Sequence, residues 1–135
     1  MKFKTLSNKE VSIEIKPSDY PIRSLDDCRS KGQFKLGQLL QEFYGSHAII
    51  LEDFILPETK LSLDFFLPHY KLAFEMQGIQ HFQFSKFFHG DITGYIKQKK
   101  RDANKRHWCE LNEIVLFEIQ EKDLELGRLK LLIYG

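Results

Sequence analysis

Two carboxylates stand at positions where β-strands normally bury carbon. Asp64 lies within the apolar run 63–67 and Glu75 within the apolar run 72–76, and residues 68–70 form a Pro-His-Tyr turn between the two runs. Carboxylates are rarely fully buried without a partner, and desolvating an unpaired one is costly. A pair of acids on adjacent strands therefore predicts a cation between them.

The ligand type points to a hard divalent ion. Carboxylate oxygens suit Mg²⁺ or Mn²⁺, which keep positions for water and a substrate phosphate and can activate that water. Because side chains alternate along a strand, Asp64, Glu75 and Gln77 are expected to project from one side of the hairpin. The other side is expected to hold the apolar residues Leu61, Leu63, Phe65, Leu67, Leu72, Phe74 and Met76.

Basic residues crowd one segment after this hairpin. They are Lys97, Lys99, Lys100, Arg101, Lys105 and Arg106, with Asp102 as the only acid among them. On a helix, Lys97, Arg101 and Lys105 are one turn apart and could follow one line of phosphates, a contact that is independent of sequence. The alternative is a solvated helix face on which Asp102 pairs with a neighbour. Acids that bind metal, followed by a cationic helix, indicate hydrolysis of phosphodiester bonds.

An aromatic segment separates the hairpin from the basic helix. Its rings are Phe82, Phe84, Phe87 and Phe88. Packing in the core is the default interpretation of such a cluster. The alternative is that Phe87 and Phe88 contact DNA as a wedge between bases, which distorts the substrate.

The elements expected to position these residues follow in a simple order. They are a hairpin over 1–16, a helix over 31–44, a strand over 47–51, a hairpin over 60–67 and 71–77, a basic helix ending near 111, a strand over 114–119 buried on both faces, and a helix over 122–133. Ser30 and Gln33 have capping-box spacing before the first helix, and Gly45 follows that helix. Glu42 near its end is either a solvated residue or an auxiliary acid aimed at the same cation. This order predicts an α/β fold, a mixed sheet flanked by helices.

Bulk properties set the limits of these interpretations. A chain of 135 residues with 42% hydrophobic and 29% charged residues predicts one globular domain, 1–135. A net charge of +1 makes any nucleic-acid signal local. Cys28 and Cys109 follow no metal-binding pattern and are expected to be free thiols. No leading signal is visible, and no apolar run approaches the roughly 20 residues that span a bilayer, so we expect a cytoplasmic protein with no membrane contact.

Two segments carry a resemblance to a known family. The segments are Leu63-Asp64-Phe65-Phe66-Leu67-Pro68 and Phe74-Glu75-Met76-Gln77-Gly78-Ile79-Gln80-His81. Together they resemble the D…ExK core of the PD-(D/E)XK nuclease superfamily, and Glu-x-x-Gly-x-Gln-His is similar to very-short-patch-repair-like and phage homing-type endonucleases. The likeness runs from about Gly32 to Ile119. It implies a restriction-endonuclease-like fold with a catalytic core over 31–119, an N-terminal hairpin over 1–16 and a C-terminal helix over 120–135.

The resemblance also implies an activity and partners. The protein is expected to be a Mg²⁺-dependent endonuclease (or one using Mn²⁺) that cuts or nicks DNA, with junctions, flaps or RNA as alternative substrates. It is expected to be bacterial or phage-encoded, and to act as a monomer or homodimer, alone or within a larger nucleic-acid-processing assembly.

The resemblance further implies a role for each matching residue. Asp64 and Glu75 hold the metal, His81 serves in general acid–base chemistry, and Glu42 is an auxiliary acid. Gln77 occupies the position usually held by lysine. A neutral amide can only hydrogen-bond, whereas lysine would orient water and stabilise charge. Two outcomes follow. Either another lysine, namely Lys71, Lys100 or Lys105, supplies that charge, or the chain is a binding subunit that has lost catalysis.

Overall fold

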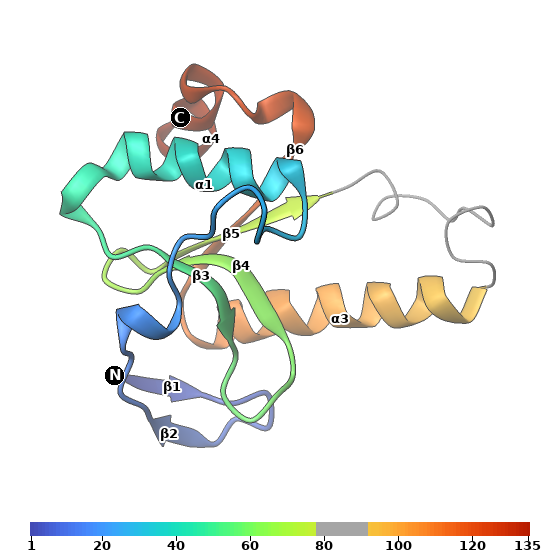
Figure 1. The fold of residues 1–135 in the computed structure, drawn as a ribbon. Coiled ribbons are helices and arrows are strands. Elements are labelled where there is room, and N and C mark those ends of the chain that lie inside the picture. The colour runs from blue at the N-terminus through green and yellow to red at the C-terminus, as the bar shows by residue number, and fades with distance from the viewer. Residues whose placement is uncertain (78–91) are drawn as a thin grey trace.

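The structure is a computed structural model that describes residues 1–77 and 92–135 (Figure 1). Its main elements are β1 (Lys2–Lys4), β2 (Glu10–Ser12), α1 (Lys31–Tyr44), β3 (Leu51–Ile55), β4 (Ser62–Leu67), β5 (Leu72–Gln77), α3 (Ile92–Leu111), β6 (Val115–Gln120) and α4 (Leu126–Tyr134). Short 3₁₀ turns lie at η1 (Pro17–Asp19), η2 (Gly45–His47) and η4 (Glu121–Asp123). The predicted mixed α/β arrangement is confirmed.

The central feature of the described residues is a four-stranded sheet in the order β3-β4-β5-β6. Its first two pairings are antiparallel and its last, between β5 and β6, is parallel. A parallel pair needs a long crossover, and α3 lies within the one that joins these strands. Strands β1 and β2 form a separate antiparallel hairpin, as predicted.

The sheet is buried on both faces, and Figure 1 shows α3 on one side with α1 and α4 on the other. Phe66 packs with Phe54 and Trp108 in the core on the α3 side. Phe65 packs with Leu36 and Leu40 in the core on the α1 side. Each such side chain contributes about 1.5–3 kcal/mol when fully buried. Adjacent residues of β4 therefore hold opposite layers of the protein together.

The predicted single apolar face of the hairpin is wrong in one respect. Leu61 and Leu63 pack in the core on the α3 side, whereas Phe65 and Leu67 pack on the α1 side. The register of β3 with β4 pairs Glu52 with Phe65 and Phe54 with Leu63. Between these pairs, Asp53 of β3 and Asp64 of β4 are left out of the ladder. The skipped residue of β3 is Asp53, whose φ is 54°. This left-handed backbone interrupts the ladder, so alternation does not run through β4 unbroken.

Local signals place the first helix correctly. Ser30 caps α1 by accepting a hydrogen bond from the backbone N–H of Gln33 at 3.1 Å. The helix ends at Tyr44, and Gly45 follows with a φ of 56°, a conformation that suits glycine. Both ends match the predicted range.

Three other predictions need correction. The strand predicted over 47–51 is β3 at Leu51–Ile55, because residues 45–47 form a 3₁₀ turn and two acids lie inside the strand. The strand predicted as buried on both faces, β6, pairs only with β5 at the sheet edge within the described residues, and its Val115 is 54% exposed. The last helix begins at Leu126 rather than near 122, because Asp123 caps the turn η4 through the backbone N–H of Gln120.

Two further expectations concern thiols and membranes. Cys28 and Cys109 are free thiols, as predicted. In the two described ranges, no helix combines the length and the apolar character that crossing a membrane requires.

Candidate functional site

A cavity of about 1080 Å³ opens where β4 and β5 part. Asp64, Glu75 and Gln77 all line it, which confirms their predicted convergence. All three are buried, with exposed fractions of 8%, 5% and 6%. The other described lining residues are Arg29, Ser30, Gly32, Gln33, Lys60, Leu61, Ser62, Met76, Gln98, Arg101, Asp102, Lys105, Gln120, Glu121 and Lys122.

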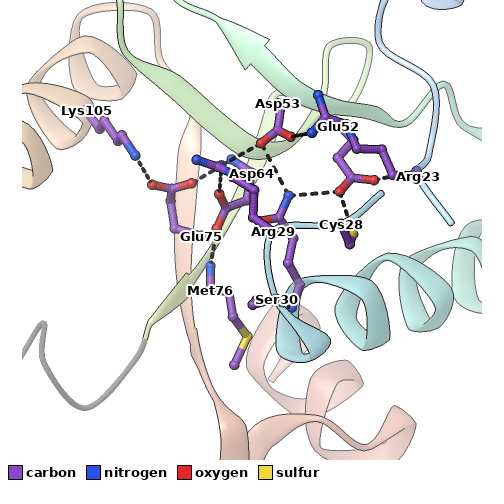
Figure 2. Close-up of polar contacts among 11 residues, drawn as sticks. Arg23, Cys28, Arg29, Ser30, Glu52, Asp53, Asp64, Glu75, Met76 and Lys105 are labelled. Carbon is purple, nitrogen blue, oxygen red and sulfur yellow. Dashed lines mark hydrogen bonds and ion pairs between the residues drawn. The ribbon is translucent and has the colours of Figure 1, made fainter. Parts of the chain in front are cut away.

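The two acids hold the strands at the point where they separate (Figure 2). The backbone ladder between β4 and β5 runs from Leu67 and Leu72 to Phe65 and Phe74 and stops there. Beyond it, Glu75 Oε2 accepts the backbone N–H of Asp64 at 2.6 Å. Asp64 Oδ2 accepts the backbone N–H of Met76 at 2.7 Å.

A buried N–H requires an acceptor, so these carboxylates stand in for the missing carbonyls of the ladder. This role fixes one oxygen of each acid. It also explains why both side chains stay at the floor of the cavity.

The remaining oxygen of each acid contacts a cationic side chain. Lys105 Nζ lies 2.7 Å from Glu75 Oε1. Arg29 Nη2 lies 2.9 Å from Asp64 Oδ1 and 2.5 Å from Asp53 Oδ1. The buried acids thus do have cationic partners, supplied by a helix and a loop on different sides of the sheet. The Arg29 side chain is 55% exposed and the Lys105 side chain 17% exposed, so Arg29 is the more accessible of the two.

A further buried acid, Glu52, was not singled out by its sequence context. Glu52 is 2% exposed and accepts hydrogen bonds from the Arg23 backbone N–H at 2.7 Å, Gln33 Nε2 at 2.8 Å and Cys28 Sγ at 3.1 Å. Its neighbour Asp53 pairs with Arg23 at 2.9 Å as well as with Arg29. Glu52 and Asp53 therefore tie the segment before α1 to the sheet.

A weak signal for this arrangement was present in the chain. Glu52 and Asp53 adjoin apolar residues, as Asp64 does, and Arg23 and Arg29 precede the cap of α1. Arg29 lies 24 positions from Asp53 along the chain, and Cys28 lies 24 positions from Glu52. Residue spacing therefore could not predict these pairs.

Electrostatics distinguish the titratable groups of the site. Burial and the nearby Glu75 charge raise the pKa of Asp64 to about 7, against the opposing effects of the Met76 N–H, Lys105 and Arg29. Burial and the Glu52 hydrogen bond raise the pKa of Cys28 to about 12, and burial raises the pKa of Cys109 to about 12. Since the thiolate is the nucleophilic form, neither cysteine is a nucleophile at neutral pH.

The donor set was compared with the needs of a divalent metal. In the part of the chain that the structure describes, no group of three or more His, Cys, Asp or Glu side chains is arranged to hold an ion. Asp64 and Glu75 supply hard oxygen donors, which is the chemistry that Mg²⁺ and Mn²⁺ prefer. Each of their four oxygens is already bonded to a protein donor. A metal held by these acids would therefore share their oxygens with these donors or displace Arg29 or Lys105.

The basic helix contributes only part of its predicted surface to the cavity. Arg101 and Lys105 line it, whereas Lys97 and Lys100 are exposed on α3 and are not among its lining residues. Arg106 instead forms an ion pair with Glu118 of β6. Asp102, the one acid of the basic run, is buried and lines the cavity.

The other predicted site residues lie elsewhere. Glu42 is exposed near the C-terminal end of α1, whereas the cavity is lined by Gly32 and Gln33 at the opposite end of that helix. The structure therefore does not bring Glu42 to the acids, because the length of α1 separates them. His81, Phe87 and Phe88 lie outside the described residues.

Comparisons with known proteins found two relatives that share a segment with this chain. The uncharacterized protein 033L of Invertebrate iridescent virus 3 is 39% identical over 61 residues, which cover 45% of this chain and 31% of that protein. The uncharacterized protein 307L of Invertebrate iridescent virus 6 is 36% identical over 59 residues, which cover 44% of this chain and 30% of that protein. No protein-family model and no solved structure matches. The chain thus shares a segment with viral proteins and spans under a third of their length.

Proposed function

We propose that this protein is an endonuclease of restriction-endonuclease-like fold that hydrolyses DNA phosphodiester bonds with a divalent metal. One observation carries the proposal. Asp64 and Glu75, contributed by neighbouring strands that part at this point, meet at the floor of a cavity that Arg101 and Lys105 also line. Buried hard-oxygen donors beside cationic side chains suit the binding of a metal ion together with a phosphate.

Each side chain has a role in this proposal. Asp64 and Glu75 hold Mg²⁺ or Mn²⁺, which supplies a water of lowered pKa and a positive charge for the leaving oxygen. The Gln77 amide hydrogen-bonds the attacking water, and Arg101 holds a backbone phosphate next to the scissile one. His81 and the aromatic pair Phe87 and Phe88 keep their predicted roles in acid–base chemistry and DNA contact.

Lys105 is the best source of the positive charge that Gln77 lacks. Of the three lysines predicted as substitutes, Lys105 contacts Glu75, at 2.7 Å, and lines the cavity. Lys71 and Lys100 are exposed and are not among its lining residues. An ammonium group on a flexible stem can leave Glu75 for a substrate oxygen without moving the backbone.

A plasmid-nicking assay with Mg²⁺ or Mn²⁺ tests the proposal. Asp64→Asn and Glu75→Gln each keep an oxygen that accepts the neighbouring backbone N–H but lose the charge that holds a metal. We expect each to reduce nicking by about 100-fold or more, in the range of groups that take part in the chemistry. Glu110→Gln, an exposed site on α3, is the matched control and should nick like the parent. Equal nicking by all four proteins would refute the metal assignment.

A second function is favoured by one specific observation, the existing protein donors on all four carboxylate oxygens. A nucleic-acid-binding subunit without catalysis would keep these pairs permanently. In that case the parent would bind DNA in a fluorescence anisotropy titration but nick no plasmid with either metal. Nicking by the parent that depends on Asp64 would exclude this alternative.

A further inference from the structure

We propose that the cavity accepts a single, unpaired phosphodiester strand rather than an intact duplex, an inference that rests on the proposed function. Its first basis is the depth of the acids. Asp64 and Glu75 are 8% and 5% exposed and are reached through the cavity. A scissile phosphate must come within bonding distance of a metal held there. The substrate backbone therefore has to enter the cavity instead of lying across its mouth.

The size of the cavity is the second basis. Its volume is about 1080 Å³, so a cube of the same volume would be about 10 Å on an edge. Pockets of this size hold a drug-sized molecule, and the major groove of duplex DNA alone is about 12 Å wide. A segment of duplex, whose major groove alone is wider than that edge, does not fit inside such a volume, whereas one strand of a few nucleotides does. A duplex could deliver a phosphate only after unpairing, which costs free energy.

The third basis is the placement of cations around the cavity. Arg29 precedes α1, Lys60 lies between β3 and β4, Arg101 belongs to α3, and Lys122 follows β6. Four separate segments thus each place a positive side chain in the cavity wall, where Arg29 is also paired with Asp64 and the acids Asp102 and Glu121 lie among the lining residues. A stiff duplex would contact such an array from one side only. A flexible strand can meet all four, as in the charged grooves of proteins that bind single strands.

The character of the cavity wall also predicts how the strand is recognised. Among its described lining residues there is no aromatic ring on which a base could stack. Contacts from Arg and Lys side chains go to phosphates and carry no sequence information. The described part of the cavity wall therefore recognises the backbone of the strand and tolerates different base sequences.

The test separates binding from cleavage. Full-length Glu75→Gln protein is titrated by fluorescence anisotropy against DNA of about 12 nucleotides, within the site sizes of single-strand binders, against its blunt duplex and against RNA of the same sequence. We expect the unpaired DNA or RNA to bind about tenfold more tightly than the duplex. Lys60→Glu and Lys122→Glu in the same background should each weaken strand binding by about threefold or more.

Lys35→Glu is the matched control, because Lys35 is exposed on α1, lies outside the cavity lining and makes the same change of charge. It should leave strand binding close to that of the parent background. Melting curves of the three variants check that folding is intact, which their exposed positions favour.

Cleavage of the same oligonucleotides by the parent with Mg²⁺ or Mn²⁺ completes the test. Duplex binding equal to or tighter than strand binding overturns the inference and leaves the proposed nuclease untouched. An equal effect of Lys35→Glu and of the cavity variants also overturns it. Tight strand binding without cleavage refutes the nuclease and leaves the strand preference standing. Preferential binding and cutting of RNA supports the inference and identifies the substrate as a strand with ribose rather than deoxyribose.

Discussion

The described strands of the sheet bury acids in two neighbouring places, and they satisfy them differently. Glu52 accepts hydrogen bonds from a backbone N–H, an amide and a thiol, all from the segment around the start of α1. Asp64 and Glu75 each share one oxygen with the backbone and offer the other to a long cationic side chain at the cavity. Figure 2 shows the two sets side by side.

The contrast distinguishes Glu52, which anchors one segment of the fold, from Asp64 and Glu75, which form the candidate site. The donors to Glu52 are a backbone N–H, a short thiol side chain and the buried Gln33 amide, so packing around the start of α1 holds them in place. The partners of Asp64 and Glu75 have flexible stems and can exchange a carboxylate for a ligand. We therefore expect changes at Glu52 to affect stability and changes around Glu75 to affect activity.

Replacing the anchor should have the largest effect on stability. Glu52→Ala removes the acceptor of one buried and two half-buried hydrogen bonds, and we expect a loss of about 3 kcal/mol in the free energy of unfolding. Urea denaturation followed by circular dichroism measures it. Glu52→Gln, which keeps an acceptor oxygen, should lose clearly less. A loss below about 0.5 kcal/mol in the alanine variant would remove the distinction between anchor and site.

Removing the cation at the site should mainly affect activity. Lys105→Met keeps the stem but not the charge, and we expect nicking to fall about 100-fold while stability falls by about 2 kcal/mol, because the largely buried Glu75 loses a charged donor. Introducing Gln77→Lys into this variant returns a lysine to the neighbourhood of Glu75 and should restore part of the activity. Rescue measured in the plasmid assay would tie the charge to catalysis, and a stability loss as large as that of Glu52→Ala would make Lys105 a second anchor.

The pH dependence of stability should report Asp64. Its pKa is about 7 in the folded protein, above its usual value of 3.8, so between these values the folded state binds a proton that the unfolded state releases. The contribution of Asp64 to stability is complete at low pH and is lost as pH rises to about 7. Asp64→Asn removes this loss.

The unfolding free energy of Asp64→Asn relative to the parent should therefore grow by about 3 kcal/mol between pH 4.5 and pH 8. Urea denaturation at both pH values measures the difference. Glu110→Gln, which is exposed, should show a constant difference. A constant difference for Asp64→Asn as well would show that the Asp64 pKa is not raised.

The smallest effect should come from the thiol of the anchor. Cys28→Ser retains a group that donates to Glu52, so stability should change by about 0.5 kcal/mol or less. Cys28→Ala removes the donor and should cost more. The order of the two variants in thermal melts checks whether Cys28 contributes a hydrogen bond or only volume.

Local rules were sufficient for part of this structure. The ends of α1 follow from Ser30 and Gly45, whose capping roles depend only on their neighbours in sequence. Glu75 and Gln77 share a face of β5 as alternation predicts, because Leu72, Phe74 and Met76 pack on the other face. Asp64 joins them although alternation breaks in β4, because the short turn between β4 and β5 sets a register that places Asp64 opposite Glu75. These features need no knowledge of distant residues.

The remaining features depend on partners far along the chain. β3 was predicted too early in the chain because two acids inside a strand lower its β propensity. The hydrogen bonds that satisfy these acids come from Arg23, Arg29 and Gln33. The pairing of Arg29 with Asp64 spans 35 positions and that of Lys105 with Glu75 spans 30. Such pairs are set by the packing of α1 and α3 on the sheet, which residue spacing does not encode.

Asp53 carries one last consequence. Its backbone is left-handed, with a φ of 54°, a conformation in which glycine is at ease and other residues are disfavoured. Its carboxylate meanwhile meets both Arg23 and Arg29. Substitution of Asp53 by glycine would remove the backbone strain and the ion pairs with Arg23 and Arg29. Substitution by alanine would keep the strain and lose the same ion pairs. Among homologous sequences, Asp or Asn at this position would indicate proteins that retain Arg29 beside Asp64. Glycine would indicate proteins in which this contact has been lost.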